Sequence, residues 1–99
     1  MPKARVLLVI KEHESRNSPG CGNVLRVVQW ILKDGASTVK LEKCGYYPRD
    51  GKRAYSYREG LMLQDLEALR PHWTQIVRWM KDPPPPPAEE SEIIEEVPF

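Results

Sequence analysis

Cationic and aromatic side chains gather in one short part of the chain, residues 40–58. This segment holds six of the fifteen Lys and Arg residues and all four Tyr residues, and only Glu42 and Asp50 oppose them. Cations attract phosphates, and flat rings stack on unpaired bases with about 1–3 kcal/mol per base, whatever the base. The segment therefore predicts a surface that binds single-stranded nucleic acid, DNA or RNA, with little sequence preference. The ten candidate contact residues are Lys40, Lys43, Tyr46, Tyr47, Arg49, Lys52, Arg53, Tyr55, Tyr57 and Arg58.

The same residues also fit a solvated hairpin without a ligand. Tyrosine is common in strands, and Lys and Arg protect sheet edges from pairing with other chains. Arg5, Arg26 and Lys33 extend the cationic surface only if they share its face, and a shift of one residue in strand register would reverse their faces. The sequence leaves both interpretations open.

Four strands are expected before and within this part of the chain. Residues 4–11 and 24–33 are short runs rich in Val, Ile and Leu. Residues 38–47 alternate apolar with polar side chains, and residues 53–58 alternate tyrosine with smaller or charged ones. Such runs are typical of strands, and the two Asp-Gly pairs of the chain mark turns between them.

The spacing of apolar residues changes to three and four after position 63, which predicts a helix packed on the sheet. Pro71 lies inside this segment and removes a backbone hydrogen bond, so we expect a kink or a restart there. Trp79 lies off the centre of the apolar stripe, where it meets either a second subunit or the edge of its own core. The residues of the stripe are Leu66, Leu69, Trp73, Ile76, Val77 and Met80.

These elements predict one α+β domain in residues 1–82, with an open four-stranded antiparallel sheet followed by a C-terminal helix (ββββα). A five-stranded OB-fold barrel is the alternative, disfavoured because four strands and a terminal helix are counted. One helix covers only one face of such a sheet, so the other is solvated, bound to a ligand or buried in a dimer. A domain this small buries little apolar area, which favours a homodimer.

The domain resembles that of the eukaryotic transcriptional coactivator positive cofactor four and its prokaryotic relatives. The likeness covers residues 5–81 and consists of the ββββα order, Lys-Leu-Glu-Lys-Cys-Gly-Tyr-Tyr at 40–47, a basic turn at 50–52, and Glu-Gly-Leu-Met-Leu at 59–63 before the helix. The long polar stretch 12–22 departs from the family pattern. The resemblance implies a dimer formed through the helices, with curved sheets whose grooves hold single-stranded DNA. By position it places Lys40, Tyr46, Lys52, Arg53, Tyr55 and Tyr57 in that groove.

The chain after Asp82 has a different composition. Residues 1–82 contain all fifteen Lys and Arg beside nine acids, a net charge of +6, whereas residues 83–99 contain five Glu and no base, a net charge of −5. The prolines 83–87 favour a stiff polyproline II spacer, and the acidic residues beyond it are expected to be disordered. The opposite charges predict that this tail occupies the basic groove when no DNA is present.

The last residues of the tail, Glu95, Glu96, Val97, Pro98 and Phe99, resemble the acidic tip of bacterial single-stranded-DNA-binding proteins. That tip also closes with acids, an aliphatic residue, proline and phenylalanine. The resemblance implies that the tip recruits replication, repair and recombination proteins: Phe99 fills a hydrophobic pocket and the acids meet a basic ridge. A fortuitous acidic end is the alternative.

Several classes of function are excluded by the residues. No nucleophile lies beside a base, no phosphate-binding glycine loop is present and the acids are scattered, so we expect no enzyme activity. The two Cys and two His lack the spacing of a metal site, and no cofactor is expected. No stretch approaches the roughly 18 apolar residues of a membrane span, and the N-terminus lacks the apolar region of a signal peptide. We expect a cytoplasmic protein associated with the nucleoid, or a viral protein acting in the host cytoplasm.

The combined interpretation is a protein that coats exposed single strands and uses residues 83–99 to recruit DNA-processing proteins. Two alternatives remain. One is a transcriptional coactivator or regulator on the same fold. The other is an interaction module whose proline run docks in an aromatic groove of a partner.

Overall fold

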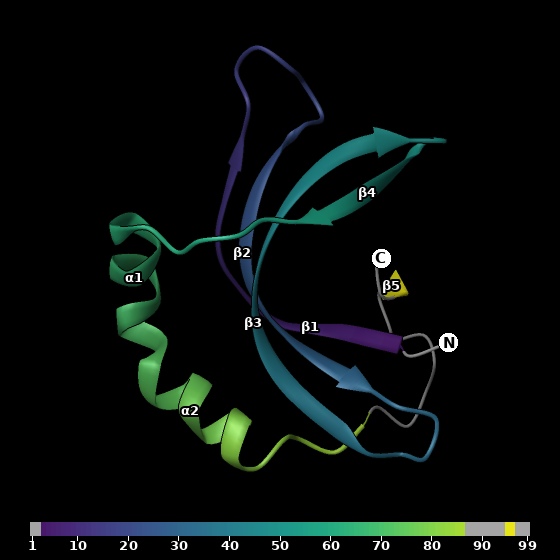
Figure 1. Ribbon diagram of the computed structural model, residues 1–99, viewed down its shortest axis with the longest axis vertical. Coiled ribbons are helices and arrows are strands. Elements are labelled where there is room, and N and C mark those ends of the chain that lie inside the picture. The colour runs from purple at the N-terminus through teal and green to yellow at the C-terminus, as the bar shows by residue number, and fades with distance from the viewer. Residues whose placement is uncertain (1–2, 87–94, 97–99) are drawn as a thin grey trace.

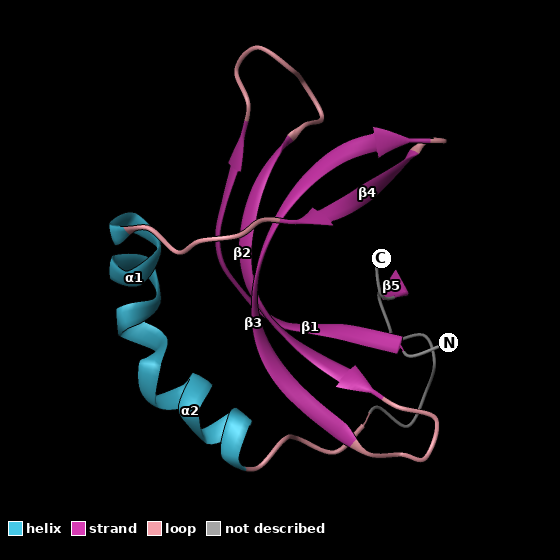
Figure 2. Ribbon diagram, viewed as in Figure 1, coloured by secondary structure: helices cyan, strands magenta, loops and turns pink. Residues whose placement is uncertain are grey.

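The chain folds into one strongly bent antiparallel sheet with a broken helix along its outer side (Figure 1). The computed structural model describes residues 3–86 and 95–96. The strands lie in the order β4-β3-β2-β1-β5, and the helical segments follow β4 in the chain (Figure 2). This arrangement confirms the predicted ββββα fold. The strands are β1 (Lys3–Glu14), β2 (Gly22–Ile31), β3 (Ser37–Arg49), β4 (Lys52–Tyr57) and the two-residue β5 (Glu95–Glu96).

Turns and bulges shape this sheet. β3 and β4 are joined by Asp50 and Gly51, whose φ angles of 52° and 77° match the two-residue hairpin turn that twists with its strands. β1 pairs with β2 as far as the end residues of both strands, so the polar stretch 12–22 extends this hairpin. The register of β1 shifts twice, between Val6 and Leu8 and between Val9 and Lys11. Such irregularities bend a strand, and the sheet curls around the face that points away from the helices (Figure 1).

The core lies between the sheet and the helices. Val27 and Val39 of the sheet pack with Leu69 and Ile76 of the helices, and all four are buried. Because strand side chains alternate, the neighbours of Val27 and Val39 in the chain point to the other face. We call that second face, opposite the helices, the open face. Alternation therefore divides β2, β3 and β4 into a core side and an open side, whereas the register shifts of β1 interrupt it there.

The helix is interrupted at Pro71, as predicted. It consists of α1 (Leu63–Leu69), the 3₁₀ turn η1 (Arg70–His72) and α2 (Trp73–Lys81). Proline occupies the start of the 3₁₀ turn, where its missing N–H is tolerated. The helical segments follow the outer curve of the sheet (Figure 2).

The predicted apolar stripe of the helix divides between two sides. Leu69 and Ile76 are buried, but Leu66, Trp73 and Met80 are exposed, so the expectation that the whole stripe faces the sheet was wrong for these three. Trp79 is partly buried and packs against the core, as one of its two alternatives expects. Leu66, Trp73 and Met80 are seven residues apart and lie on one flank of the stripe, whereas Leu69 and Ile76 lie on the flank that faces the sheet. An exposed apolar stripe is the result.

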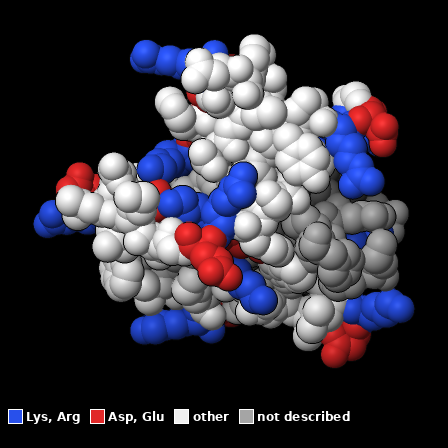
Figure 3. Space-filling view, turned by 45° about the horizontal axis from the view of Figure 1, so that its top comes forward, with Lys and Arg blue, Asp and Glu red and all other residues white. Residues whose placement is uncertain are grey.

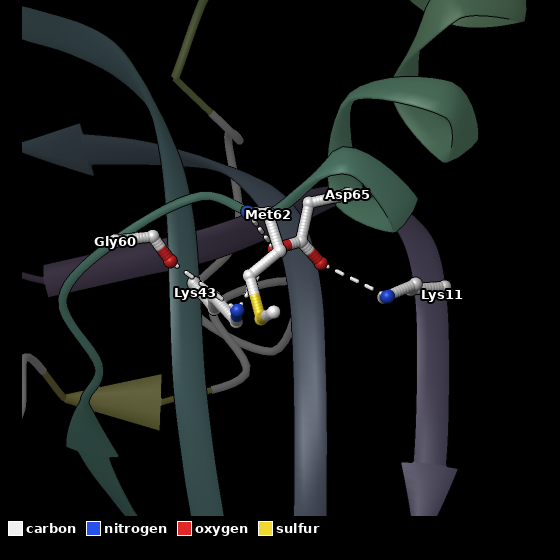
Figure 4. Close-up of polar contacts among 5 residues, drawn as sticks. All are labelled: Lys11, Lys43, Gly60, Met62 and Asp65. Carbon is white, nitrogen blue, oxygen red and sulfur yellow. Dashed lines mark hydrogen bonds and ion pairs between the residues drawn. The ribbon is translucent and has the colours of Figure 1, made fainter.

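A buried carboxylate fastens α1 to the sheet. Asp65 is almost fully buried. Its carboxylate accepts hydrogen bonds from Lys43 Nζ at 2.8 Å and from the Met62 amide at 2.9 Å, and it forms an ion pair with Lys11 Nζ at 2.9 Å (Figure 4). Lys43 also donates to the Gly60 carbonyl at 3.3 Å. Burial opposes ionisation of Asp65, but these hydrogen bonds outweigh it and hold its pKa below the ordinary value. One side chain thus joins β1, β3 and the start of the helix.

Candidate nucleic-acid interface

The open face collects aromatic and cationic side chains from three strands. The register pairs Val28 with Lys40 and Arg26 with Glu42 across β2 and β3. It pairs Tyr46 with Tyr55 across β3 and β4. Directly opposed residues share a face, so these side chains lie together on one side of the sheet. Trp30, Arg53 and Tyr57 join them by alternation.

Each of three cations on this face lies over an aromatic ring. The Arg53 guanidinium carbon is 4.0 Å from the Tyr46 ring centroid, and that of Arg26 is 4.4 Å from the Tyr55 centroid. Lys40 Nζ is 4.8 Å from the Trp30 centroid. The Tyr46 and Tyr55 rings are neighbours, with centroids 6.4 Å apart at an interplanar angle of 56°. Cation–π contacts of this kind hold charges at fixed positions beside rings.

Glu42 orders the centre of the open face. It is buried, and one of its carboxylate oxygens accepts hydrogen bonds from Trp30 Nε1 at 2.8 Å and from the Tyr57 hydroxyl at 3.3 Å. Its other oxygen lies 3.6 Å from Arg26 Nη2. Burial and the Glu42 carboxylate both raise the pKa of Tyr57, so this phenol stays protonated and neutral at any physiological pH. The two rings are therefore anchored at their polar ends.

Tyr46 contributes less surface than the sequence suggests. Only 3% of it is exposed, because its ring packs with Val24 and Cys44 under the Arg53 side chain. Its hydroxyl lies where a side chain on Gly22 would start: a Cβ there would be 2.5 Å from it. Glycine at position 22 thus leaves room for this ring. Tyr46 supports the face, and its buried ring offers no stacking surface to a base.

The ten predicted contact residues divide equally between the two sides of the sheet. Alternation in β3 and β4 causes this division, because neighbours in a strand point to opposite faces. The open face holds Lys40, Tyr46, Arg53, Tyr55 and Tyr57, and the core side holds Lys43, Tyr47, Arg49, Lys52 and Arg58.

Two of the ten predicted contact residues already form ion pairs within the protein. Lys43 is engaged by the buried Asp65, and Arg53 pairs with Glu12 at 2.8 Å. Basic side chains also group near the centre of the view in Figure 3, beside acidic atoms, and others stand at its margins. The cations of the chain are therefore not confined to one face.

Trp30 and Glu42 also belong to the site, although neither was among the predicted contact residues. Arg26, predicted only as an extension of the surface, does join the face. Arg5 pairs with Gln29 on the core side and does not. One feature of the sequence could have placed Trp30 on this face: the Asp-Gly turn between the second and third strands. Counting residues outward from this turn pairs Trp30 with Thr38, on the same face as Lys40. This count requires the number of residues in the loop between the two strands, and the sequence composition does not give that number.

An open pocket of about 310 Å³ lies where β4 ends. Residues of both faces line it. Trp30, Lys40, Glu42 and Tyr57 come from the open face. Leu41, Lys43 and Arg58 complete the lining.

The tail residues named in the sequence analysis lie largely outside the described residues. Val97, Pro98 and Phe99 are among these. Glu95 and Glu96 form β5, antiparallel to Lys3 and Ala4, in a segment for which the sequence predicts no regular structure. The proline run is not a free spacer at its start, since Gln29 Nε2 donates to the Pro84 carbonyl and Arg5 Nη2 to the Pro85 carbonyl.

No family model, curated protein or solved structure matches this chain. Neither helix in the described ranges is long and apolar enough to cross a membrane. Within the same ranges, no three His, Cys, Asp or Glu side chains lie close enough together to hold a metal ion.

Proposed function

We propose that this protein binds single-stranded nucleic acid on its open face with little sequence preference, and coats exposed DNA strands. The observation that carries the proposal is the stacking of Arg26, Lys40 and Arg53 on the rings of a single concave sheet face. Trp30 and Tyr57 offer partly exposed rings to unstacked bases, and Lys40 and Arg53 are exposed cations for phosphates. This pairing of rings with charges suits a strand whose bases are unpaired.

A titration of the full chain with thymidine oligomers tests the proposal. We expect binding with quenching of tryptophan fluorescence, because Trp30 lies on the proposed surface. Affinity should fall steeply with salt as counterions are released from the phosphates, and duplex DNA of equal length should bind more weakly. Equal affinity for duplex, or no dependence on salt, would contradict the proposal. An RNA oligomer in the same series decides between the two nucleic acids.

The tail has a second role in this proposal. Residues 95–99 recruit DNA-processing proteins while the domain holds the strand, as their resemblance to the tip of bacterial single-stranded-DNA-binding proteins implies. A transcriptional role on the same fold differs only in the partner that is captured. The interaction-module alternative is less well supported, since the carbonyls of Pro84 and Pro85 already accept hydrogen bonds from the protein's own sheet.

The proposal includes a homodimer formed through the helices. Leu66, Trp73 and Met80 recur every seven residues on the solvent side of the helical segments, and Met62 and Leu63 extend their exposed surface. Trp73 is 61% exposed. A large exposed apolar patch on a small protein marks an interaction site. A second copy supplies the same apolar stripe, which is the arrangement a two-fold interface requires.

Replacing Trp73 by glutamate should convert the dimer to a monomer. The substitution places a charge in the centre of the proposed interface, where burial without a partner is costly. Light scattering after size exclusion measures the mass. Thr74→Glu on the same exposed turn is the matched control and should keep the dimer. A wild-type chain that is monomeric at high micromolar concentration, or a Trp73→Glu variant that stays dimeric, would exclude this interface.

A further inference from the structure

The outer edge of β3 is only half covered. β4 pairs with Cys44–Arg49, and among the described residues no strand pairs with the outer side of residues 37–42 (Figure 1). At the boundary, the Arg58 amide donates to the Lys43 carbonyl at 2.8 Å. A strand edge of this length is a ready template for an additional strand.

The backbone polarity of this edge follows from that last bond. The Lys43 carbonyl points outward toward the end of β4, so by alternation the amides and carbonyls of Ser37, Val39 and Leu41 point outward too. The turn between β2 and β3 gives the same result. There the Leu32 amide donates to the Ala36 carbonyl, so the backbone amides and carbonyls of even-numbered residues in β3 point inward to β2. Three alternate residues of β3 thus present backbone hydrogen-bonding groups that an extended peptide can use.

The charge beside this edge is positive. The 310 Å³ pocket lies at the point where β4 stops, and Lys40 and Arg58 line it. Two other lining charges are already compensated, Glu42 by Arg26 and Lys43 by Asp65. Lys40 and Arg58 form no ion pair within residues 3–86 and 95–96, although Lys40 lies over the Trp30 ring. The edge therefore suits an extended segment that is acidic.

The chain itself contains a segment of that chemistry. Residues 88–97 carry five glutamates and two adjacent isoleucines. Part of this segment adds as a strand at the opposite edge, where Glu95 and Glu96 pair with the start of β1 beside Lys3. Two hydrogen bonds direct the tail of each chain toward its own β1 edge. Gln29 of β2 holds the Pro84 carbonyl, and Arg5 of β1 holds the Pro85 carbonyl.

We infer that the open edge of β3 binds the acidic tail of a second copy by strand addition, with residues from 88–97 pairing along Ser37, Val39 and Leu41. The glutamates of the incoming strand meet Lys40 and Arg58, and an isoleucine enters the pocket beside Trp30 and Tyr57. This contact joins copies through their tails and is separate from the helix interface. It requires no nucleic acid, but it shares Lys40, Trp30 and Tyr57 with the proposed nucleic-acid surface.

Amide hydrogen exchange followed by NMR on the ¹⁵N-labelled full chain tests the inference. A peptide of residues 88–99 should slow exchange at the Val39 and Leu41 amides about tenfold or more, because these amides gain hydrogen bonds. The Thr38 and Lys40 amides, which point to β2, should change little. A peptide with all five glutamates replaced by glutamine is the matched control and should protect much less. The Lys40→Glu chain should lose most of the protection by the acidic peptide.

The full chain without added peptide identifies the occupant. Protection of Val39 and Leu41 should rise with protein concentration in the Trp73→Glu background, which removes the helix interface. It should vanish when the five tail glutamates are replaced by glutamine. Peptide binding without concentration dependence would mean that the edge serves an acidic segment of another protein, and would overturn the assignment to a second copy. No protection by the peptide, or equal protection by its glutamine form, would overturn the edge site itself.

Discussion

Replacing Tyr57 by leucine should weaken binding of a thymidine oligomer about tenfold, since a base stacked on an aromatic ring contributes about 1–3 kcal/mol. Tyr57 lies on the open face, is 45% exposed and is held by Glu42. Fluorescence anisotropy of a labelled oligomer measures the affinity. Leucine keeps the apolar bulk of the side chain and removes the flat ring.

Tyr47 provides a matched control on the same hairpin. It is 40% exposed, close to the value for Tyr57, but points to the opposite side of the sheet. Tyr47→Leu should leave the affinity within about twofold, as expected of a residue that touches no base. Equal losses at the two positions would show that the open face is not the binding surface. No loss at either would remove tyrosine stacking from the mechanism.

Truncating Asp65 to alanine should lower the free energy of unfolding by about 3 kcal/mol, the lower end of what is found when one partner of a buried ion pair is removed. The lower end applies because Lys11 and Lys43 are partly exposed and can regain water once the carboxylate is gone. The Met62 amide at the start of α1 also loses its acceptor. Urea denaturation followed by circular dichroism gives the value.

The pH dependence of this effect has a definite sign. The pKa of Asp65 is lowered by folding, so its contribution is complete above its ordinary value of 3.8 and is lost as the pH falls from there toward the folded-state pKa. The difference in stability between the wild type and Asp65→Asn should therefore be constant near neutrality and shrink below pH 3.8. Glu67→Ala, at an exposed position of the same helix, is the control. A difference that grows on acidification would contradict the ion-pair assignment.

The order of elements was predictable because it depends on local signals. Asp50-Gly51 specifies the hairpin between β3 and β4, and Pro71 specifies the break in the helix. The faces were harder to predict, because they depend on pairing register. Cations and tyrosines clustered in sequence at 40–58 alternate between two sides of the sheet, so half of the predicted set lies on the side opposite the open face.

The largest misassignment concerned Lys43, which sequence reasoning placed among the phosphate contacts. Its partner Asp65 is 22 residues away and looks like an ordinary acid of a helix. Nothing in the spacing of the charged residues indicates that Asp65 is buried. Trp30 and Glu42 were missed for a related reason: a hydrogen bond between the two connects neighbouring strands, and only the β2–β3 register brings them together.

The hydrogen bonds from Gln29 to the Pro84 carbonyl and from Arg5 to the Pro85 carbonyl hold the start of the segment that carries the last residues. Fourteen residues follow Pro85, and a fully extended chain of that length spans about 50 Å. Once Glu95 and Glu96 leave β1, a partner that binds Phe99 in the proposed function stays within that distance of the β1 side of the sheet. Loss of the Arg5 bond alone would leave the bond from Gln29 to Pro84 in place, so both bonds must be lost before the free segment starts at the end of α2.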